Sequence, residues 1–436
     1  MRRPICLDFT HLVSRLGIPY PSGIDKVDLA YGRYFTEGSQ SPGVHYGWLQ
    51  PHILSADRSR EIVSLATQAH WEDGEVDRDR IFRNLKAKLT GNPNGSGDQS
   101  GSGNSTERLR CLLRGAAAHV QRARLRLARD EKSLPINAIY LNAAQHAFER
   151  HRFFRWIATR PDVLTAFVIH DLLPLDFPEY FPTGYKAVFT RRVDTMTMHG
   201  KAFIVSTNVV RDRLKEELKR REVPSAPVHV EPFPTTLVPP GKYQSGKAED
   251  LTDPELSAAG YFVCIGTIEP RKNHLLLLNI WRQIVSQGEG HIPKLVIIGG
   301  RGWENEQAVD VLDRGRLTRP YVIEGSGLSS AGLRRIVANA RALLMPSFAE
   351  GYGLPLVEAL TLGTPVVTTD RPVFREVTQG CATYLSPIDG VGWRRLIQQL
   401  TADAETLGTA RAKASQFRPP TWDRYFSRIN EFLDSL

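Results

Sequence analysis

Short apolar runs alternate with longer segments of helical periodicity along most of the chain. In the first half these runs are PICLDFT, AIYLNA, TAFVIHDL, AFIVSTN and VHVEPF. In the second half they are YFVCIGT, KLVIIGG, YVIEG, ALLMPS and PVVTT. Short apolar runs separated by helical patterns predict βα units, whose strands form parallel sheets.

A change of composition divides this pattern in two. Residues 238–256 (VPPGKYQSGKAEDLTDPEL) are rich in Pro, Gly, Ser and Lys, and the strand pattern restarts after them. At 436 residues the chain is also too long for one typical core. We therefore expect two α/β domains, at residues 1–240 and 258–415. Ligands in such sheets bind at the carboxyl ends of the strands, which can face each other across a cleft.

Two segments of the first half depart from the α/β pattern. Residues 90–106 are rich in Gly, Ser and Asn and predict a flexible loop. Residues 107–132 then place seven arginines among leucines and alanines. Such a basic helix is typical of a segment that lies on an anionic membrane, and equally of a solvated surface helix. The sequence does not choose between the two.

Composition narrows the class of protein. The first residues, MRRPICLDFTHLV, are too polar for a signal peptide, and no window approaches the ~18 apolar residues of a membrane span. The four cysteines are far apart, which favours reduced core thiols in a cytosolic protein. The net charge of +9 suggests an anionic partner without identifying it. Because basic and aromatic residues are not interleaved as in nucleic-acid-binding proteins, we expect no nucleic-acid partner.

Two phosphate-binding patterns are near misses. GKYQSGKA (residues 241–248) has Ala248 where a P-loop needs Ser or Thr, and it lies in the linker. GSGLSSAG (residues 325–332) has Ser330 where a dinucleotide fingerprint needs its third glycine. A hydride-transfer enzyme is therefore not expected.

A stronger pattern lies in SFAEGYGLPLVEALTLGTPVV, residues 347–367. The preceding run ALLMPS predicts a strand that ends at Met345 or Pro346, and a helix should begin near Leu354. The glycines between them allow the backbone to approach a ligand, and helix N–H groups suit a phosphate or a sugar oxygen. Glu350 and Glu358 are well placed to bind diols, although Glu is also common at helix starts because of the dipole.

A second turn points to the same chemistry. In CIGTIEPRKNHLLLLNIW, residues 264–281, a strand ends at Gly266 and the next turn carries Arg271 and Lys272. Paired cations at the carboxyl end of a strand can neutralise a diphosphate. A polar turn with solvated charges is the ordinary alternative. The turn with Arg271 and Lys272 lies in the same domain as Glu350 and Glu358, which favours a shared ligand site.

These residues carry a resemblance to a known family. GTIEPRKN, VIIGGRGW and ANARALLMPSFAEGYGLPLVEALTLGTPVV resemble family 4 of the retaining glycosyltransferases, which have the GT-B fold. The resemblance is dense over residues 261–387. It is thinner at IPYPSGIDKV, VIHDLLPLDFPEYFP and FIVSTNVVRDRL, and residues 49–134 match nothing in the family. It implies two Rossmann-like domains that face each other across a cleft, with residues 416–436 as a helix crossing back to the first domain.

The resemblance also implies roles for residues of the second domain. Glu350 would contact the transferred sugar and Glu358 the ribose hydroxyls, while Arg271 and Lys272 would bind phosphate. Many members carry Arg directly after the strand's glycine, where this chain has Thr267, which puts a third phosphate contact in doubt. The remaining donor-binding residues that it implies are Gly351, Tyr352, Gly353, Leu354, Gly266 and Gly325, the last beside the nucleotide base.

Residues of the first domain complete the implied site. The family places a histidine at the end of the strand TAFVIHD, so His170 should face the donor sugar and Asp171 the acceptor side. Ser22 and Gly23 resemble the loop that approaches the diphosphate and the acceptor. Ser22 is equally well explained as the N-cap of the following helix.

The sequence therefore predicts a retaining transfer of a sugar from a GDP- or UDP-sugar, mannose-type by slight preference, to a saccharide or lipid-linked acceptor. The setting would be bacterial surface polysaccharide synthesis, in the cytoplasm or on the inner face of the membrane, with an anionic membrane surface as a candidate partner. We expect no cofactor and no required metal, because cations and helix amides can stabilise the leaving diphosphate. The alternatives are a GT-B sugar-nucleotide epimerase or phosphorylase, a noncatalytic sugar-nucleotide sensor, or a basic nucleic-acid-binding protein.

Overall fold

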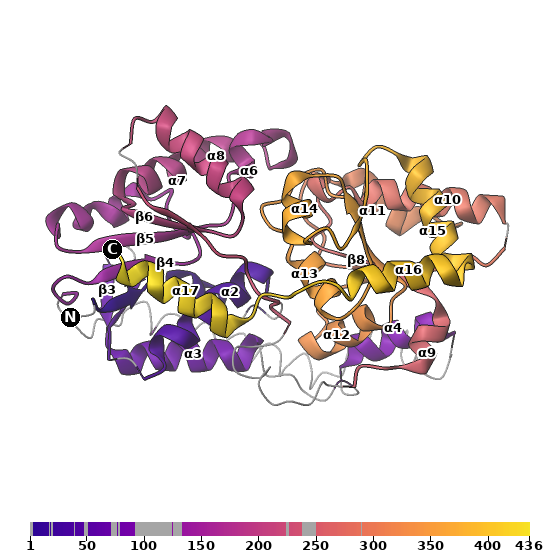
Figure 1. Cartoon of the computed structure of the whole chain (residues 1–436), viewed down its shortest axis with the longest axis horizontal. Helices are drawn as coiled ribbons and strands as arrows, with labels where there is room; N and C mark the ends of the chain where they lie inside the picture. Colours follow the sequence, from indigo (N-terminus) through magenta and orange to yellow (C-terminus); the bar gives the residue numbers. More distant parts are fainter. Residues whose placement is uncertain are drawn as a thin grey trace.

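The computed structural model has two lobes, each built on one parallel sheet (Figure 1). It describes residues 3–16, 18, 21–38, 40–47, 51–70, 76, 79–91, 124, 133–223, 226–237, 250–288 and 290–436. The predicted Gly/Ser-rich loop, beyond residues 90 and 91, and the predicted basic helix, apart from residue 124, lie outside these residues. Most of the predicted linker, residues 238–249, lies outside them too.

The N-terminal lobe holds a sheet of five strands in the order β1-β4-β5-β6-β7, all parallel. All five apolar runs of the first half form these strands, and a short antiparallel hairpin, which was not predicted, packs beside β1. The strands are β1 (Ile5–Leu7), β4 (Ile139–Asn142), β5 (Leu164–Ile169), β6 (Ala202–Val205) and β7 (Val228–Val230), and the hairpin consists of β2 (Gly43–Tyr46) and β3 (Pro51–Leu54).

Helices cover both faces of this sheet, as expected for a Rossmann-like domain (Figure 1). A capping box begins α2, since the Ser22 hydroxyl accepts a hydrogen bond from Asp25 N while the Asp25 carboxylate accepts one from Ser22 N. The helical elements are α1 (Thr10–Arg15), α2 (Gly23–Thr36), α3 (Ala56–His70), the 3₁₀ helix η3 (His151–Thr159), α6 (Leu173–Asp176), η4 (Pro178–Tyr180), α7 (Tyr185–His199) and α8 (Asn208–Arg220).

The C-terminal lobe holds a six-stranded parallel sheet in the order β10-β9-β8-β11-β12-β13. Five of its strands were predicted, and β13 was not. The strands are β8 (Tyr261–Ile265), β9 (Lys294–Ile298), β10 (Val322–Gly325), β11 (Ala342–Met345), β12 (Val366–Thr369) and β13 (Thr383–Leu385). The helical elements are α9 (Pro254–Ala259), η5 (Pro270–Lys272), α10 (His274–Gln287), α11 (Glu306–Arg314), α12 (Ser330–Ala338), α13 (Leu354–Thr361), α14 (Pro372–Val377), α15 (Gly390–Ala402) and α16 (Ala404–Ala414).

The last helix, α17 (Trp422–Asp434), crosses back onto the N-terminal lobe, as the sequence predicted (Figure 1). Its buried face is aromatic and packs on α2. The hydroxyls of Tyr425 and Tyr31 lie 2.7 Å apart, and the rings of Phe426 and Tyr34 stack at 4.2 Å. The α2–α17 contact thus ties the end of the described chain to the lobe in which it begins.

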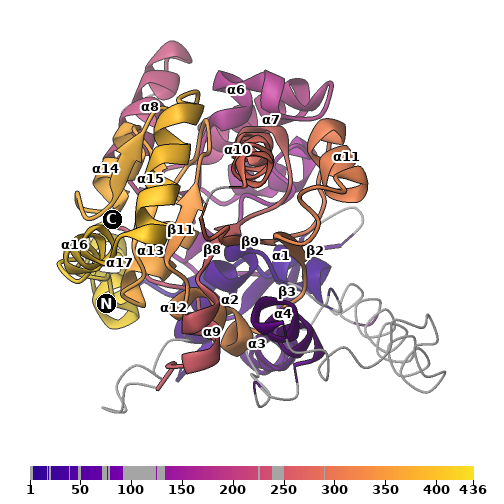
Figure 2. The same ribbon diagram turned by 90° about the vertical axis from the view of Figure 1, so that its right-hand side faces the viewer.

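A second helix, α4 (Arg80–Thr90), crosses in the opposite direction and packs on the C-terminal lobe (Figures 1 and 2). Its apolar side chains Phe82, Leu85 and Leu89 are each only 2% exposed. The Lys86 ammonium pairs with Asp253 at 2.8 Å. The predicted domain of residues 1–240 is therefore not contiguous in space, since residues 79–91 cover part of the second lobe.

Candidate functional site

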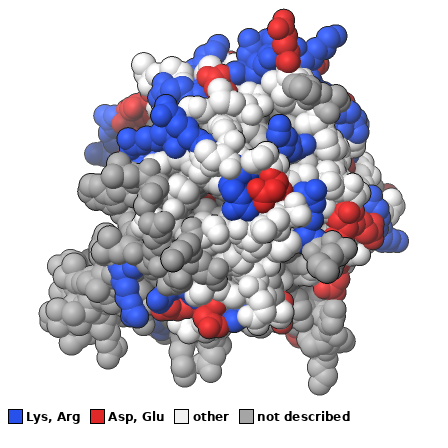
Figure 3. All heavy atoms as spheres, turned by 90° about the vertical axis from the view of Figure 1, so that its left-hand side faces the viewer, with Lys and Arg blue, Asp and Glu red and all other residues white. Residues whose placement is uncertain are grey.

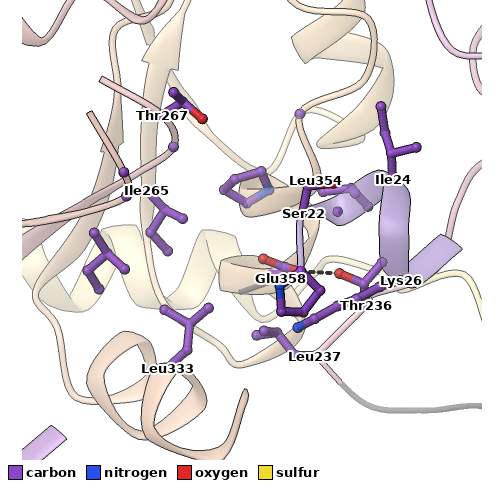
Figure 4. Close-up of a pocket in the computed structure, with 18 of the residues that line it drawn as sticks. Ser22, Ile24, Lys26, Thr236, Leu237, Ile265, Thr267, Leu333, Leu354 and Glu358 are labelled. Atoms are coloured by element: carbon purple, nitrogen blue, oxygen red, sulfur yellow. Dashed lines mark hydrogen bonds between the residues drawn. The ribbon is translucent and has the colours of Figure 1, made fainter. Parts of the chain in front are cut away.

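A cavity of about 1060 Å³ lies between the lobes, at the carboxyl ends of both sheets (Figure 4). The N-terminal lobe contributes the loops after β1, β5 and β7, and the C-terminal lobe the loops after β8, β9, β10 and β11. With the exception of Gly325, every residue that the sequence singled out for the site lines this cavity, namely Ser22, Gly23, His170, Asp171, Gly266, Thr267, Arg271, Lys272, Glu350, Gly351, Tyr352, Gly353, Leu354 and Glu358.

Glu350 is the centre of an ion-pair cluster in the cavity. Its two carboxylate oxygens lie 2.6 Å from Arg271 Nη1 and 2.5 Å from Lys272 Nζ. Arg271 also pairs with Glu269 at 2.5 Å and donates to the carbonyl of Ala349 at 3.0 Å. The two sequence motifs therefore meet in space, because the strands β8 and β11 that precede them are neighbours in the sheet.

The charges of this cluster decide the protonation of Glu350. Burial alone would raise the pKa of its carboxyl, but Arg271 and Lys272 outweigh burial and hold that pKa below its usual value. Burial raises the pKa of Glu269 despite the same two cations. Glu350 is thus a fixed carboxylate, unable to donate a proton near neutral pH.

In the turn between β11 and α13, the two glycines lie where a side chain would clash with neighbouring atoms or strain the backbone. A Cβ on Gly351 would lie 2.6 Å from Asp171 Cβ and 2.7 Å from the carbonyl oxygen of His170. Gly353 has φ +95° and is the N-cap of α13. Tyr352 donates its hydroxyl to the carbonyl of Phe233, 2.6 Å away. The turn therefore joins the two lobes and leaves its backbone facing the cavity.

Glu358 lies deeper in the cavity, just after the first turn of α13 (Figure 4). Its carboxylate accepts a hydrogen bond of 2.7 Å from the hydroxyl of Thr236, which follows β7. Burial raises the pKa of this carboxyl, and the nearby Lys26 ammonium opposes that effect. Lys26 extends from α2 and donates to the hydroxyl of Ser330 at 2.9 Å.

His170 ends β5 and is buried as a neutral ring. Its Nε2 lies 2.9 Å from the carbonyl oxygen of Ala143, which identifies Nε2 as the protonated nitrogen and leaves Nδ1 as an acceptor. Burial lowers the pKa of the imidazole to about 4. The next residue, Asp171, accepts a hydrogen bond from Leu173 N, and burial raises the pKa of its carboxyl.

The remaining predicted residues shape the cavity wall. Gly266 has φ +145°, a conformation that favours glycine, and a Cβ there would lie 3.2 Å from Lys272 Cε. A Cβ on Gly23 would lie 2.4 Å from Leu354 Cδ1, so α2 touches α13 across the cleft. Ser22 serves as the N-cap of α2 and also lines the cavity. Gly325 lies behind the wall, against Leu85 of α4, and the residues after it line the cavity instead.

Several lining residues were not predicted. Lys26 lies one turn after Ser22, and Glu269 lies inside the motif GTIEPRKN, so their neighbours in sequence could have pointed to them. Thr236 comes from a segment without a recognisable motif, and Asp79 from a segment whose one pattern is an Asp-x-Asp. Only the three-dimensional fold brings these two to the cavity.

The described residues contain no group of three or more His, Cys, Asp or Glu side chains arranged to hold a metal ion. The sequence does contain one Asp-x-Asp, Asp77-Arg78-Asp79, a spacing that can bind Mg²⁺ together with a diphosphate. Asp77 lies outside the described residues, and the Asp79 carboxylate already accepts hydrogen bonds from three backbone N–H groups. Metal independence therefore stays a prediction.

Comparison with known sequences agrees with the site. Residues 259–403 match the family model described as glycosyl transferases group 1. The chain is 30% identical over 234 residues to the serotype-specific mannosyltransferase WbdA of Escherichia coli, which covers 50% of this chain and 28% of that protein. It is 34% identical over 169 residues to O-antigen chain mannosyltransferase B of E. coli, or 37% of this chain and 43% of that protein. The chain thus spans less than half the length of these relatives.

Comparison with solved structures concerns the fold alone. The α,α-trehalose 6-phosphate synthase of Burkholderia multivorans aligns with 100% of this chain and 97% of its own, with a TM-score of 0.57 and 11% identity. The N-terminal domain of Candida albicans trehalose-6-phosphate phosphatase aligns over 81% of each chain with a TM-score of 0.50 and 11% identity. Residues 259–403, in the C-terminal lobe, are thus similar to the group 1 glycosyl transferases, and the chain has the GT-B fold.

Proposed function

We propose that the protein transfers a hexosyl group, mannosyl in type, from a GDP- or UDP-sugar to a saccharide or lipid-linked acceptor with retention at the anomeric carbon. The observation that carries this proposal is the buried Glu350 carboxylate, fixed by Lys272 and Arg271 in the cavity between the lobes. The names of the mannosyltransferase relatives support the sugar and the polysaccharide setting.

The donor would lie along the carboxyl ends of the C-terminal strands. Its diphosphate would lie at Lys272 and at the free N–H groups where α13 begins, with the sugar at Glu350 and the ribose at Glu358. Each of these groups already lines the cavity. A diphosphate would also satisfy the Lys272 ammonium when Glu350 turns to the sugar hydroxyls.

Lys272 and Arg271 would stabilise the charge that develops on the leaving diphosphate. Glu350 is a poor candidate for a covalent nucleophile, because both of its oxygens are held by cations. Retention without an enzyme nucleophile requires the acceptor hydroxyl to attack from the face that the diphosphate leaves. The N-terminal wall, with Ser22, His170 and Asp171, would hold that acceptor.

A place beside the membrane belongs to the proposal as well. Among the described residues, no helix is long and apolar enough to cross a bilayer. Lys and Arg side chains gather toward the upper edge of the outer face of the N-terminal lobe, with isolated Asp and Glu among them (Figure 3). Binding of the protein to anionic vesicles, and loss of that binding when the arginines at 108–129 become alanine, would support a peripheral location.

Thermal stabilisation by nucleotides tests the donor proposal directly. GDP or UDP at 100 times its dissociation constant should stabilise the fold by ~2.7 kcal/mol. Glu358→Gln should weaken that stabilisation, whereas exposed Arg83→Ala on α4 should leave it unchanged. No stabilisation by any nucleoside diphosphate or its sugars would refute the proposal, and turnover of the donor without acceptor, or only with orthophosphate, would indicate an epimerase or a phosphorylase.

A further inference from the structure

The α4 helix brings a carboxylate from the N-terminal half of the sequence to the C-terminal wall of the cavity. Asp79 is the N-cap of α4, and its Oδ1 accepts hydrogen bonds from Ile81 N at 2.9 Å and Phe82 N at 3.1 Å. Asp79 is also one of the residues that line the cavity. Because α4 is docked through three buried apolar side chains, the position of Asp79 is fixed by the C-terminal lobe.

The second carboxylate oxygen contacts the loop between β10 and α12. Asp79 Oδ2 accepts a hydrogen bond of 2.8 Å from Ser329 N, and a Cβ on Gly332 would lie 2.9 Å from that oxygen. On the other side of the loop, Lys26 Nζ donates to Ser330 Oγ. Two side chains of the N-terminal half thus hold a loop of the C-terminal lobe whose residues 326–330 line the cavity.

This loop lies at one end of the cavity. Figure 4 shows Thr267 at one end of the drawn pocket and Leu333 of α12 at the other, with Glu358 between them. Ile265, Leu237 and Leu333 form an apolar wall toward that second end. A ligand with its diphosphate near Lys272 and its ribose at Glu358 would therefore place the flat face of its base against Leu333 and the edge of its base near the loop at Ser329.

We propose that Asp79 accepts a hydrogen bond from the nucleobase of the donor and favours guanine over uracil. The inference rests on the proposed function, since it takes a nucleoside diphosphate sugar as the ligand. The α4 helix, which lies outside the family segment of residues 259–403, would then help to select the donor nucleotide.

The hydrogen-bonding capacity of the carboxylate supports this assignment. A carboxylate offers about four lone-pair positions, and three of those on Asp79 are used by Ile81, Phe82 and Ser329 N–H groups. The remaining one, on Oδ2, can accept a further hydrogen bond. Guanine presents N1–H beside its N2 amino group, two donors on one edge. Uracil presents a single N–H between two carbonyl oxygens, which a carboxylate repels.

The experiment compares three ligands, namely GDP, UDP and ribose 5-diphosphate, which has no base. Asp79→Ser removes the carboxylate but keeps a good N-cap for α4, and Asp79→Asn replaces one acceptor by a donor. Arg83→Ala, exposed on the same helix, is the control. We expect both Asp79 variants to bind GDP about 10- to 100-fold more weakly, the range for a hydrogen bond to a charged group, with ribose 5-diphosphate binding unchanged.

Comparison of GDP with UDP separates recognition of guanine from positioning of the loop, which would contact either base. An equal loss for GDP and UDP would mean that Asp79 only orders the loop, an equal loss for all three ligands would mean that it affects the site as a whole, and unchanged GDP binding would mean that it contributes nothing; each of these results overturns the inference. Each titration is run with Mg²⁺ and with EDTA, because an Asp79 effect seen only with Mg²⁺ would identify a metal ligand instead. If the unaltered protein binds GDP but Asp79→Ser binds it equally well, only this inference fails. If the unaltered protein binds no nucleotide, the proposed function fails with it.

Discussion

Lys272 and Arg271 are adjacent cations that contact the same carboxylate, yet they are held differently. Arg271 contacts Glu350, Glu269 and the carbonyl of Ala349. The contact that the described residues show for the Lys272 ammonium is Glu350. A cation with one partner can transfer to a ligand at lower cost than one with three. Lys272 is therefore the more suitable group for a diphosphate, and Arg271 the more suitable one for holding the turn in place.

This difference predicts two distinct defects. Lys272→Ala should lower kcat about 10²- to 10³-fold, as loss of one group that stabilises developing charge does, and leave stability nearly unchanged. Arg271→Ala should also destabilise the fold by about 3–5 kcal/mol, because it leaves Glu269 buried without its partner. Turnover at saturating donor and urea midpoints distinguish the two. Equal stability of both variants would contradict the assignment.

His170 predicts a pH dependence of stability. Its pKa is about 4 in the fold, below the 6.5 of an unperturbed histidine, because burial disfavours the charged ring. As the pH falls below about 6.5 the unfolded chain takes up the proton first, so the stability present at pH 7 decreases as the pH falls toward 4. For this group the loss between pH 7 and pH 5 is about 2 kcal/mol.

The variant His170→Gln should remove that share of the decrease. Denaturant titrations at pH 7 and pH 5 measure it in the variant and in the unaltered protein. His146, His199 and His274 also have pKa values lowered by burial, so a smaller decrease should persist in the variant. The same pH dependence in both proteins would show that His170 is protonated equally in the folded and unfolded chain.

The sequence could predict those site residues that lie in short, contiguous motifs. Glu350 and Glu358 are separated by one turn and the start of one helix. Arg271 and Lys272 follow one strand. The local pattern of strand, turn and helix was therefore enough to place all four at the carboxyl ends of strands. Asp79 and Thr236 reach the cavity through contacts made across the lobe boundary. No local pattern encodes such contacts, because they depend on how two separately built surfaces meet.

At the scale of elements, the strands of both sheets were predictable because they are buried on both sides and read as continuous apolar runs. The hairpin β2–β3 was not, since Gly43–Tyr46 and Pro51–Leu54 are short and contain His, Gly and Pro. The α4 helix has a clear amphipathic pattern in RIFRNLKAKLT, but periodicity states only that one face is buried. It does not state which lobe buries that face.

Because α4 docks on the C-terminal lobe, a substitution in α4 should lower the stability of the protein through contacts with residues more than 200 positions away. Leu85→Ala should destabilise the protein by about 2–5 kcal/mol, because Leu85 is 2% exposed and packs against Gly325 of β10. Arg83→Ala, exposed on the same helix, should change stability by less than about 0.5 kcal/mol. Urea denaturation of both variants measures the difference. Equal midpoints would show that α4 is not docked in solution.

At the scale of the whole molecule, the described residues change from one lobe to the other four times along the chain. Residues 3–70 belong to the N-terminal lobe, α4 to the other, residues 133–230 to the first again, α9 to α16 to the second, and α17 to the first (Figure 1). Each lobe is therefore covered in part by one helix from the other half of the sequence, α4 on the C-terminal lobe and α17 on the N-terminal lobe. The GT-B assignment followed from the sequence, whereas this exchange of helices, α4 above all, did not.

The exchange predicts that neither half is stable alone. A fragment of residues 250–436 lacks α4, and a fragment of residues 1–240 lacks α17, so each should expose an apolar surface and associate. Size-exclusion chromatography of each fragment, and of the two mixed, measures this. Recovery of a stable species only in the mixture is the expected result, and two monomeric, cooperatively folding fragments would contradict it.

The crossing of α4 also delays its burial during synthesis, because the lobe that covers it is made much later. Leu85 is synthesised 325 − 85 = 240 residues before its partner Gly325. At about 5–20 residues per second, that delay is roughly 10–50 s. During it, Phe82, Leu85 and Leu89 have no native surface to cover them. The nascent first half should therefore bind chaperones that recognise apolar helices, until β10 has been synthesised and can cover α4.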